Sequence, residues 1–163
     1  MRMEARLEGE LAELREKLAA LSRINRHALM KDIAQGLRSS TMDRFRSTKS
    51  PEGKPWEPSI RAQEGQGLTL THTTRLKNSI KSEADATGAA VGTNTIYAAT
   101  HQFGDESRTI RAKKGKYLKF KVRGRWVNIE KVTVNIPARP YLGISDEDME
   151  DIRDEVEHAV RRS

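Results

Sequence analysis

The strongest constraint on the fold is a strict alternation of apolar and basic residues late in the chain. Residues 118–123 read LKFKVR, so apolar and basic side chains take turns. Because successive side chains of a strand point to opposite faces, this pattern predicts a strand with one apolar and one basic face. Gly124 marks a turn, and Val127 and Ile129 continue the apolar positions on a return strand.

A third alternating segment follows at once, with its apolar residues on the opposite parity. Val132, Val134 and Ile136 are its apolar positions. A bulge or break near residues 130–131 is needed to keep both apolar sets on one face, because a shift of one residue turns every side chain over. We therefore expect a basic β-hairpin that spans residues 108–136.

The positive charge of the chain is concentrated in this hairpin. The chain of 163 residues has a net charge of +7, from 30 Lys and Arg against 23 Asp and Glu. Nine basic residues and no acid lie between residues 108 and 125, and subtracting them from +7 leaves −2 for the rest. Such a block predicts an acidic or polyanionic partner, or a like-charged loop held in solvent.

Two interpretations of the hairpin stay open. In the functional one it contacts DNA phosphates or an acidic protein surface. In the other it is a solvated strand face, whose lysines block unwanted edge pairing. Tyr117 and Trp126 share the polar parity of their strands, so we expect aromatic rings among the cations. The candidate contact residues are Lys113, Lys114, Lys116, Lys119, Lys121, Arg123 and Arg125.

Helical patterns occupy both ends of the chain. A 4-3-4-3 leucine spacing from Leu7 to Leu21 predicts a helix with a narrow apolar seam, and we expect that seam to dock on a neighbouring subunit rather than on its own core. A second helix is predicted over residues 26–46. A last helix begins after Ser145, which caps it, with Asp148 at its third position. The predicted buried stripe of that helix is Met149, Ile152, Val156 and Val160.

The middle of the chain predicts shorter elements. Residues 50–59 read SPEGKPWEPS, and their three prolines end any helix and present Trp56 on a stiff loop. That tryptophan is either a lid on the core or an anchor for a partner. We expect a helical turn at 75–80, a short strand at 89–92 and a short helix at 96–103 that Gly104 ends.

Together these elements predict an α+β fold, a small antiparallel β-sheet with flanking helices. The expected regions are an N-terminal helical region (1–47), an α+β core (48–144) and a C-terminal helix (145–163), within a single structural domain. Charged residues make up 33% of the chain and hydrophobic residues 36%, so the polar surface is large for the core that supports it. Helices that find their partner on another chain explain this ratio.

The sequence gives little support to catalysis. The chain has no cysteine, which excludes a disulfide scaffold, a thiolate zinc site and a cysteine nucleophile. Its four histidines lack metal-ligand spacing, and neither a phosphate-binding loop nor a nucleophile elbow is present. We expect no enzymatic activity, no cofactor and no metal. Without a signal peptide or an apolar run of about 18 residues, no membrane contact is expected either.

Five segments, taken in order, resemble the tail-completion or virion morphogenesis proteins of tailed bacteriophages. They are LMKDIAQGLRSSTMDRF, SPEGKPWEP, TTRLKNSI, VGTNTIYAATHQFG and IPARPYLGISDEDMEDI. The resemblance covers roughly residues 24–155. The resemblance implies a structural virion protein, made in the host cytoplasm. It implies a ring, commonly hexameric, at the head-proximal end of the tail, which terminates the tail tube and joins it to the neck.

This role assigns expected contacts to the residues. The N-terminal helices and the proline-rich loop would meet neighbouring subunits, the tail tube or the neck proteins, while the basic hairpin would face an acidic partner or the DNA in the channel. The alternative is a small basic DNA-binding or DNA-packaging accessory protein. The candidate interface residues are Leu7, Leu11, Leu14, Leu18, Pro51, Gly53, Trp56, Arg139 and Tyr141.

Overall fold

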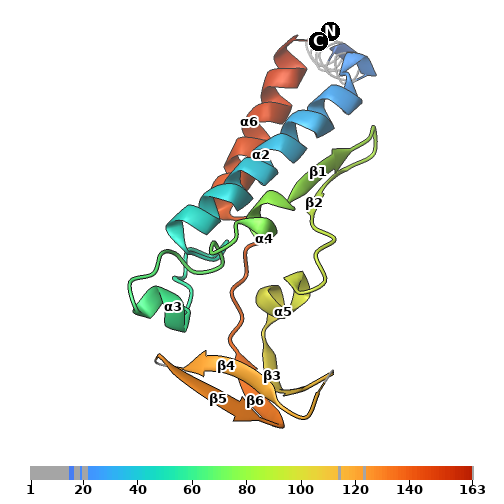
Figure 1. The fold of residues 1–163 in the computed structure, drawn as a ribbon. Coiled ribbons are helices and arrows are strands. Elements are labelled where there is room, and N and C mark those ends of the chain that lie inside the picture. Colours follow the sequence, from blue (N-terminus) through green and yellow to red (C-terminus); the bar gives the residue numbers. More distant parts are fainter. Residues whose placement is uncertain (1–14, 17–18, 20–21, 114, 123, 163) are drawn as a thin grey trace, which may run out of the picture. The chain divides into compact units, whose positions relative to one another are not determined.

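The structure is a computed structural model that describes residues 15, 16, 19, 22–113, 115–122 and 124–162 (Figure 1). The chain divides into two compact units, each built from segments far apart in the sequence. Unit 1 takes the described residues of Met1–Arg44, Ile80–Thr93 and Ile144–Ser163, and unit 2 takes Phe45–Ser79 and Asn94–Gly143. The predicted α+β class is confirmed, whereas the division into three regions stays a prediction.

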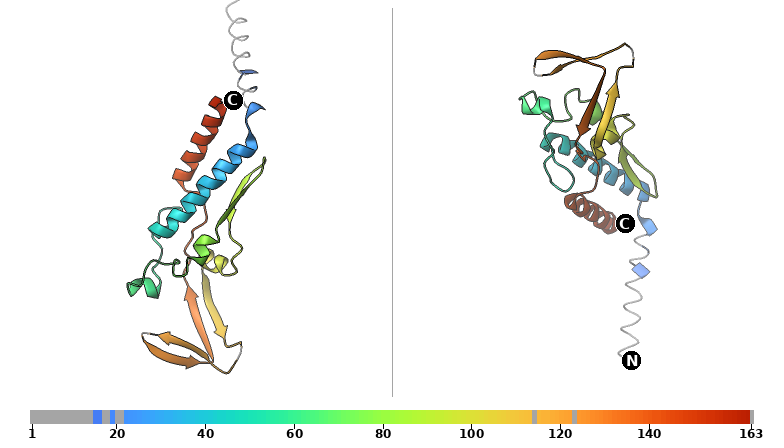
Figure 2. Two further views of the ribbon diagram at one scale, coloured as in Figure 1. Left: turned by 45° about the horizontal axis from the view of Figure 1, so that its top comes forward. Right: turned by 90° about the horizontal axis from the view of Figure 1, so that it is seen from below.

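Unit 1 is built on most of helix α2 (Arg26–Ser47), with helix α6 (Asp146–Arg162) running alongside it (Figures 1 and 2). Asn25 caps α2, because its Oδ1 accepts a hydrogen bond from the backbone N–H of Ala28 at 3.1 Å. The face of α2 that carries Leu29, Ile33 and Ala34 is buried. The predicted helix over residues 26–46 is thus confirmed.

A short hairpin of strands β1 (Lys81–Ala84) and β2 (Ala89–Gly92) completes unit 1. Its entry is fixed to α2, because the Arg38 Nε donates to the carbonyl oxygen of Ile80 at 2.9 Å. Ile80 itself is only 1% exposed. The strand expected at 89–92 therefore exists, and its partner β1 precedes it directly.

A buried ion pair joins the two long helices. Arg44 donates to the carboxylate of Asp148, and both side chains are buried. Asp148 also accepts from the Ser145 backbone N–H at 2.7 Å, while the Ser145 hydroxyl accepts from the Asp148 N–H at 3.1 Å. Burial raises the pKa of Asp148, but hydrogen bonds from Ser145 and Ser40 and the Arg44 charge outweigh it, so the pKa lies below its usual 3.8. The predicted cap at Ser145 is confirmed.

The predicted buried stripe of α6 is wrong in part. Met149 is 39% exposed and Val156 is 37% exposed, while Asp148 is buried in their place. The reason is that α6 is held to α2 through its Asp148 side, and within unit 1 the structure describes no element that covers the side of Met149 and Val156.

Unit 2 has an aromatic core. The ring of Phe45 lies 5.8 Å from that of Trp56 and 5.2 Å from that of Tyr141, and all three side chains are buried. Leu76 of helix α4 (Arg75–Asn78) and Ala98 of helix α5 (Ala98–Phe103) are buried too. Helix α3 (Ile60–Gln63) is a further single turn, capped by the Ser59 hydroxyl.

Gly104 ends α5 as predicted. Its φ of 77° with ψ of 177° is a conformation that favours glycine. A Cβ at this position would lie 2.9 Å from the backbone N of Ala138 and from the backbone O of Ile136. The residue is therefore fixed by both its torsion angle and the close approach of another strand.

The remaining strands of unit 2 form two antiparallel pairs. Strand β3 (Asp105–Arg111) pairs with β6 (Lys131–Ile136), and β4 (Leu118–Val122) pairs with β5 (Arg125–Ile129). The β4–β5 hairpin is thus inserted between the partners of the outer pair, and Figure 2 shows it at their far end. We call the whole of residues 105–136 the arm.

Of the bulge or break predicted near residues 130–131, the structure shows the break, between β5 and β6. The segment at 132–136 does not pair with the β4–β5 hairpin; it pairs with β3 instead. The opposite parity of its apolar residues is therefore explained by a change of partner at residue 130. An irregularity lies instead in β3 between Asp105 and Arg108, where Ser107 has a φ of 57°.

Candidate functional site

The β4–β5 hairpin presents a face of cations and exposed aromatic rings. Its register places Lys121 opposite Trp126 and Lys119 opposite Asn128, and these four residues define the basic face. The Lys119 Nζ lies 5.3 Å from the centre of the Trp126 ring, and the Lys121 Nζ lies 5.9 Å from it. Trp126 is nevertheless 64% exposed. The expected placement of aromatic rings among the cations is confirmed.

The other predicted basic residues are spread over the arm. Lys113 and Lys116 lie in the connection from β3 to β4, where the Lys116 Nζ sits 5.5 Å from the Tyr117 ring. Arg125 pairs with Val122 in the register, so it belongs to the apolar face at the end of the hairpin. Lys114 and Arg123 lie outside the described residues.

The apolar side of the arm lacks a core. None of the hydrophobic residues whose burial is described in β3, β4, β5 and β6 is buried, and Ile110 is 39% exposed. Alternation this regular is typical of strands whose apolar face is covered. The described part of the chain leaves that face only half-buried, as Leu118, Phe120, Val127 and Ile129 show.

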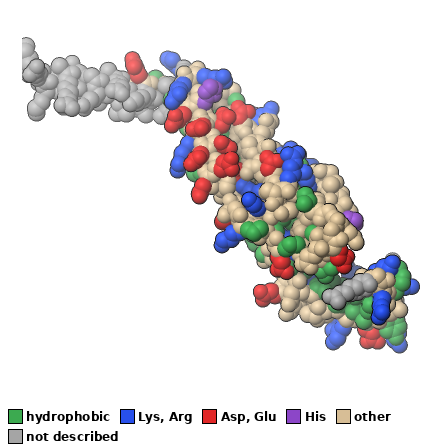
Figure 3. Space-filling model, turned by 90° about the vertical axis from the view of Figure 1, so that its left-hand side faces the viewer, with side chains coloured by type: hydrophobic (Ala, Val, Ile, Leu, Met, Phe, Trp, Pro, Cys, Tyr) green, Lys and Arg blue, Asp and Glu red, His purple; other side chains and the backbone are tan. Residues whose placement is uncertain are grey.

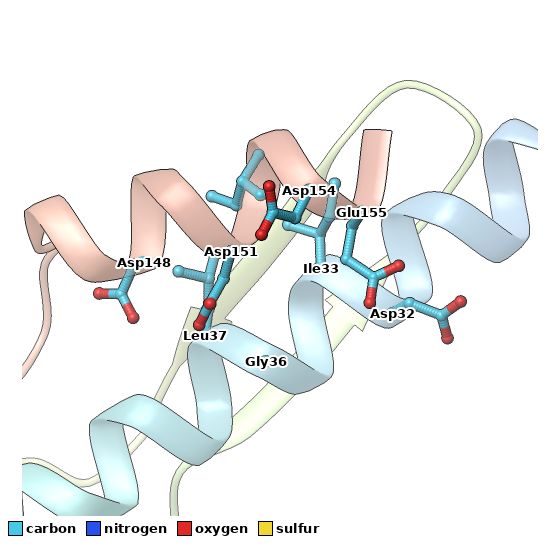
Figure 4. Close-up of a pocket in the computed structure, with 9 residues that line it drawn as sticks. Asp32, Ile33, Gly36, Leu37, Asp148, Asp151, Asp154 and Glu155 are labelled. Carbon is cyan, nitrogen blue, oxygen red and sulfur yellow. The ribbon is translucent and has the colours of Figure 1, made fainter. Parts of the chain in front are cut away.

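A second candidate surface is a groove of about 220 Å³ between α2 and α6 (Figure 4). Its apolar part is formed by Ile33, Leu37 and Ile152. Gly36 lies in the wall, and a Cβ there would meet nothing within 4 Å. The carboxylates that line the groove are those of Asp32, Asp148, Asp151, Asp154 and Glu155. We call this set the acidic groove.

The acidic groove is strongly negative. Helix α6 carries eight acidic residues against three basic ones, and the space-filling view shows acidic side chains gathered over the helices of unit 1 (Figure 3). Asp148 is neutralised by Arg44. Asp151, Asp154 and Glu155 have neither a hydrogen bond nor an ion pair from their side chains to the described residues. Their charges therefore face solvent.

The predicted interface residues near the proline-rich loop lie inside unit 2. The Trp56 Nε1 donates to the Pro140 carbonyl at 2.8 Å, and the Arg139 Nε donates to the Glu57 carbonyl at 2.7 Å. The Tyr141 hydroxyl donates to the Ala98 carbonyl at 3.2 Å, and burial raises the pKa of Tyr141 to about 12. Of the two interpretations of Trp56, the structure shows the lid on the core.

The contact of the proline-rich loop with a partner therefore stays a prediction. Pro51 is buried, and a Cβ on Gly143 would lie 2.6 Å from its Cγ. Gly53 is exposed at the tip of the loop with a φ of 76°. Any contact that the loop makes with a partner would use its exposed backbone and charged residues rather than Trp56, Arg139 or Tyr141. Leu7, Leu11, Leu14 and Leu18 lie outside the described residues.

Sequence reasoning missed three exposed apolar side chains of unit 2. Ile96 is 98% exposed, Phe103 is 78% exposed and Ile60 is 75% exposed. Phe103 is the last residue of α5, Ile96 precedes that helix, and Ile60 begins α3. No local sequence pattern marks them as exposed. Single exposed apolar side chains are common on protein surfaces, so these three residues define no site.

The titratable side chains of the described residues were the remaining candidates for a site. Among them, no group of three or more His, Asp or Glu side chains is arranged to hold a metal ion. Burial, with a smaller contribution from Arg139, lowers the pKa of His101 below 6.5, and its Nδ1 is buried without a partner in the described structure. In the same part of the chain, no helix has the length and apolar character needed to cross a bilayer.

Comparison with known proteins gives two matches. The model of the phage virion morphogenesis family matches residues 5–161. The chain is also 33% identical over 156 residues to the protein "Mu-like prophage FluMu G protein 2" of Haemophilus influenzae. The aligned region covers 93% of this chain and 94% of that protein. No solved structure matches the chain.

Proposed function

Because the chain belongs to the phage virion morphogenesis family, we propose that it is a non-catalytic virion protein that forms a ring at the head-proximal end of the tail. The ring, of six subunits, terminates the tail tube and joins it to the neck. Its partners are further copies of itself, the tail tube and the neck or connector proteins, with the DNA passing through the channel.

The observation that carries this proposal is the incompletely covered apolar side of the arm. Strands β4, β5 and β6 alternate regularly, yet the hydrophobic side chains described in the 32 residues of the arm are half-buried or exposed and none is buried. Apolar area that is left exposed in the single chain favours association, at roughly 25 cal/mol for each Å² that a partner removes from water. A protein that presents one surface to its neighbour and a different surface to the next forms a closed ring when the rotation closes.

The test is a phage that lacks this protein. We expect tails of abnormal length, together with capsids that carry no tail, in electron micrographs of the lysate. Supplying the intact chain in trans restores normal virions, which controls for effects on neighbouring genes. Tails of normal length that still join to heads would contradict the proposal.

A second candidate function is DNA binding, and the exposed Lys119 and Lys121 beside Trp126 favour it. It predicts that the purified chain binds duplex DNA, with an affinity that falls steeply as salt is added. Replacing both lysines by serine would then abolish binding, whereas the matched replacement of the exposed Lys31 and Lys54 would not. The ring proposal expects weak DNA affinity that none of these changes alters strongly.

A further inference from the structure

We propose that the basic face of one copy docks in the acidic groove of a second copy. This inference rests on the proposed ring and names the contact that builds it. Lys119 and Lys121 meet the carboxylates of α6, and Trp126 covers the apolar part of the groove. Both surfaces belong to every subunit, so the contact repeats around the ring.

The basic face has the composition of a binding surface. Its central tryptophan is large, rigid and 64% exposed, and such residues dominate the binding energy of many interfaces when a partner covers them. The two lysine Nζ atoms lie 5.3 and 5.9 Å from the centre of the ring, within the range of a favourable cation–π contact. The cations are thereby held beside the indole, where a partner meets both at once.

The acidic groove offers the complementary chemistry. Ile33, Leu37 and Ile152 provide apolar contact, and the absent side chain of Gly36 leaves room beside them. Asp151, Asp154 and Glu155 surround that area and have no cation of their own within the described residues. Ile152 lines the groove together with these acids. The basic face of a second copy can therefore contact apolar and charged groups at the same time.

The charge distribution favours a second copy over DNA. The arm contains ten basic and three acidic residues, and α6 contains eight acidic and three basic ones. Contact between copies brings the positive charge of the arm next to the negative charge of α6, so both charges are compensated in every subunit. Binding to DNA would compensate the positive charge of the arm alone. It would leave α6 as a negative surface that repels the phosphates.

The first experiment reverses the charges and then restores their match. Lys119→Glu with Lys121→Glu reverses the hairpin, and Asp151→Lys with Asp154→Lys reverses the groove; these side chains are exposed, so the fold is retained. Each reversed protein is expected to lose about tenfold or more in self-association, measured by sedimentation at matched salt. The protein with all four changes regains it. Lys54→Glu with Glu64→Lys, exposed and outside both surfaces, serves as the matched control.

The second experiment uses the absence of cysteine from the chain. The double variant Asn128→Cys, Asp154→Cys carries one thiol on each surface, and a short bismaleimide should link it into a ladder of multimers. Each single variant should give at most dimers. The reaction is run on the purified protein and on tails that carry it, so that assembly on the tail is included.

The outcomes separate this inference from the proposed function. Restored self-association in the fourfold variant, together with the ladder, supports the contact. Rings on tails that give no link between copies, or a link within one chain, would overturn the contact and leave the ring. Loss of duplex DNA binding in the reversed hairpin with unchanged self-association would overturn it in favour of DNA. A protein absent from the tail end would instead overturn the proposed function.

Discussion

The aromatic core and the arm of unit 2 are made from similar side chains but are stabilised in different ways. Phe45, Trp56 and Tyr141 are at most 5% exposed, and the Phe45 ring packs against the other two, whereas Trp126 of the arm is 64% exposed. Residues of the core also satisfy their polar atoms internally, as the bond from the Trp56 Nε1 to Pro140 shows. The difference shows that the aromatic core stabilises unit 2, while the Trp126 side chain of the arm is exposed and available to a partner.

The largest loss of stability is expected when an aromatic ring is removed from the core of unit 2. Phe45→Ala deletes a ring that is fully buried between two others, and we expect a loss of about 3–5 kcal/mol in the free energy of unfolding. Trp126→Ala is the matched change in the arm and should cost less than about 0.5 kcal/mol. Denaturant unfolding of the two variants measures both values, and equal losses would contradict the distinction.

The buried ion pair of unit 1 should give the next largest effect. Asp148→Asn leaves Arg44 buried without its counter-charge, and we expect a loss of about 3 kcal/mol. Because the folded-state pKa of Asp148 is lowered, its contribution is fully present above the unfolded value of 3.8 and is lost as the pH falls below it.

Unfolding measured between pH 7 and pH 3 checks this sign. The wild-type protein should lose stability below pH 4 by more than the variant does. A variant that follows the same acid dependence as the wild type would show that Asp148 carries none of it.

A smaller effect is expected at the joint between the core and the arm. Gly104→Ala places a Cβ 2.9 Å from backbone atoms at a positive φ, so we expect a loss of about 1–3 kcal/mol, seen as a lower thermal midpoint. Gly88→Ala, where nothing lies within 4 Å and φ is not positive, is the control and should change little. An unchanged midpoint in Gly104→Ala would show that the joint tolerates a side chain.

The smallest effect has the opposite sign. Gly36→Ala lies inside α2 where a Cβ meets nothing, so it should stabilise the helix by about 0.5–1 kcal/mol in thermal unfolding. The same change adds a methyl group to the wall of the acidic groove. A destabilised variant would show that the wall is closed in solution.

Local signals explain which parts of the fold could be predicted. Helix α2, the end of α5 at Gly104, the cap at Ser145 and the β4–β5 hairpin each follow from residues within a few positions of one another. Strand β3 reads DESRTIR, which has no apolar alternation, and it pairs with residues of β6 that lie 20 to 31 positions away. No local pattern could therefore reveal it.

Of the two candidate surfaces, local sequence signals predict one and not the other. The basic face was predicted from the alternation of residues 118–123 and the parity of Trp126, both of which are local. The acidic groove was not, because it arises only where α2 meets α6, and its lining residues on the two helices lie more than 100 positions apart in the sequence. The burial of Asp148 in place of Met149 depends on Arg44, which is about one hundred positions away.

An electron cryomicroscopy map of intact virions, resolved at the join between head and tail, tests the central claim most directly. The account predicts a ring of six copies there, with the arm of each copy on helix α6 of the next. A ring whose arms line the DNA channel, or a join that does not contain this protein, would contradict it.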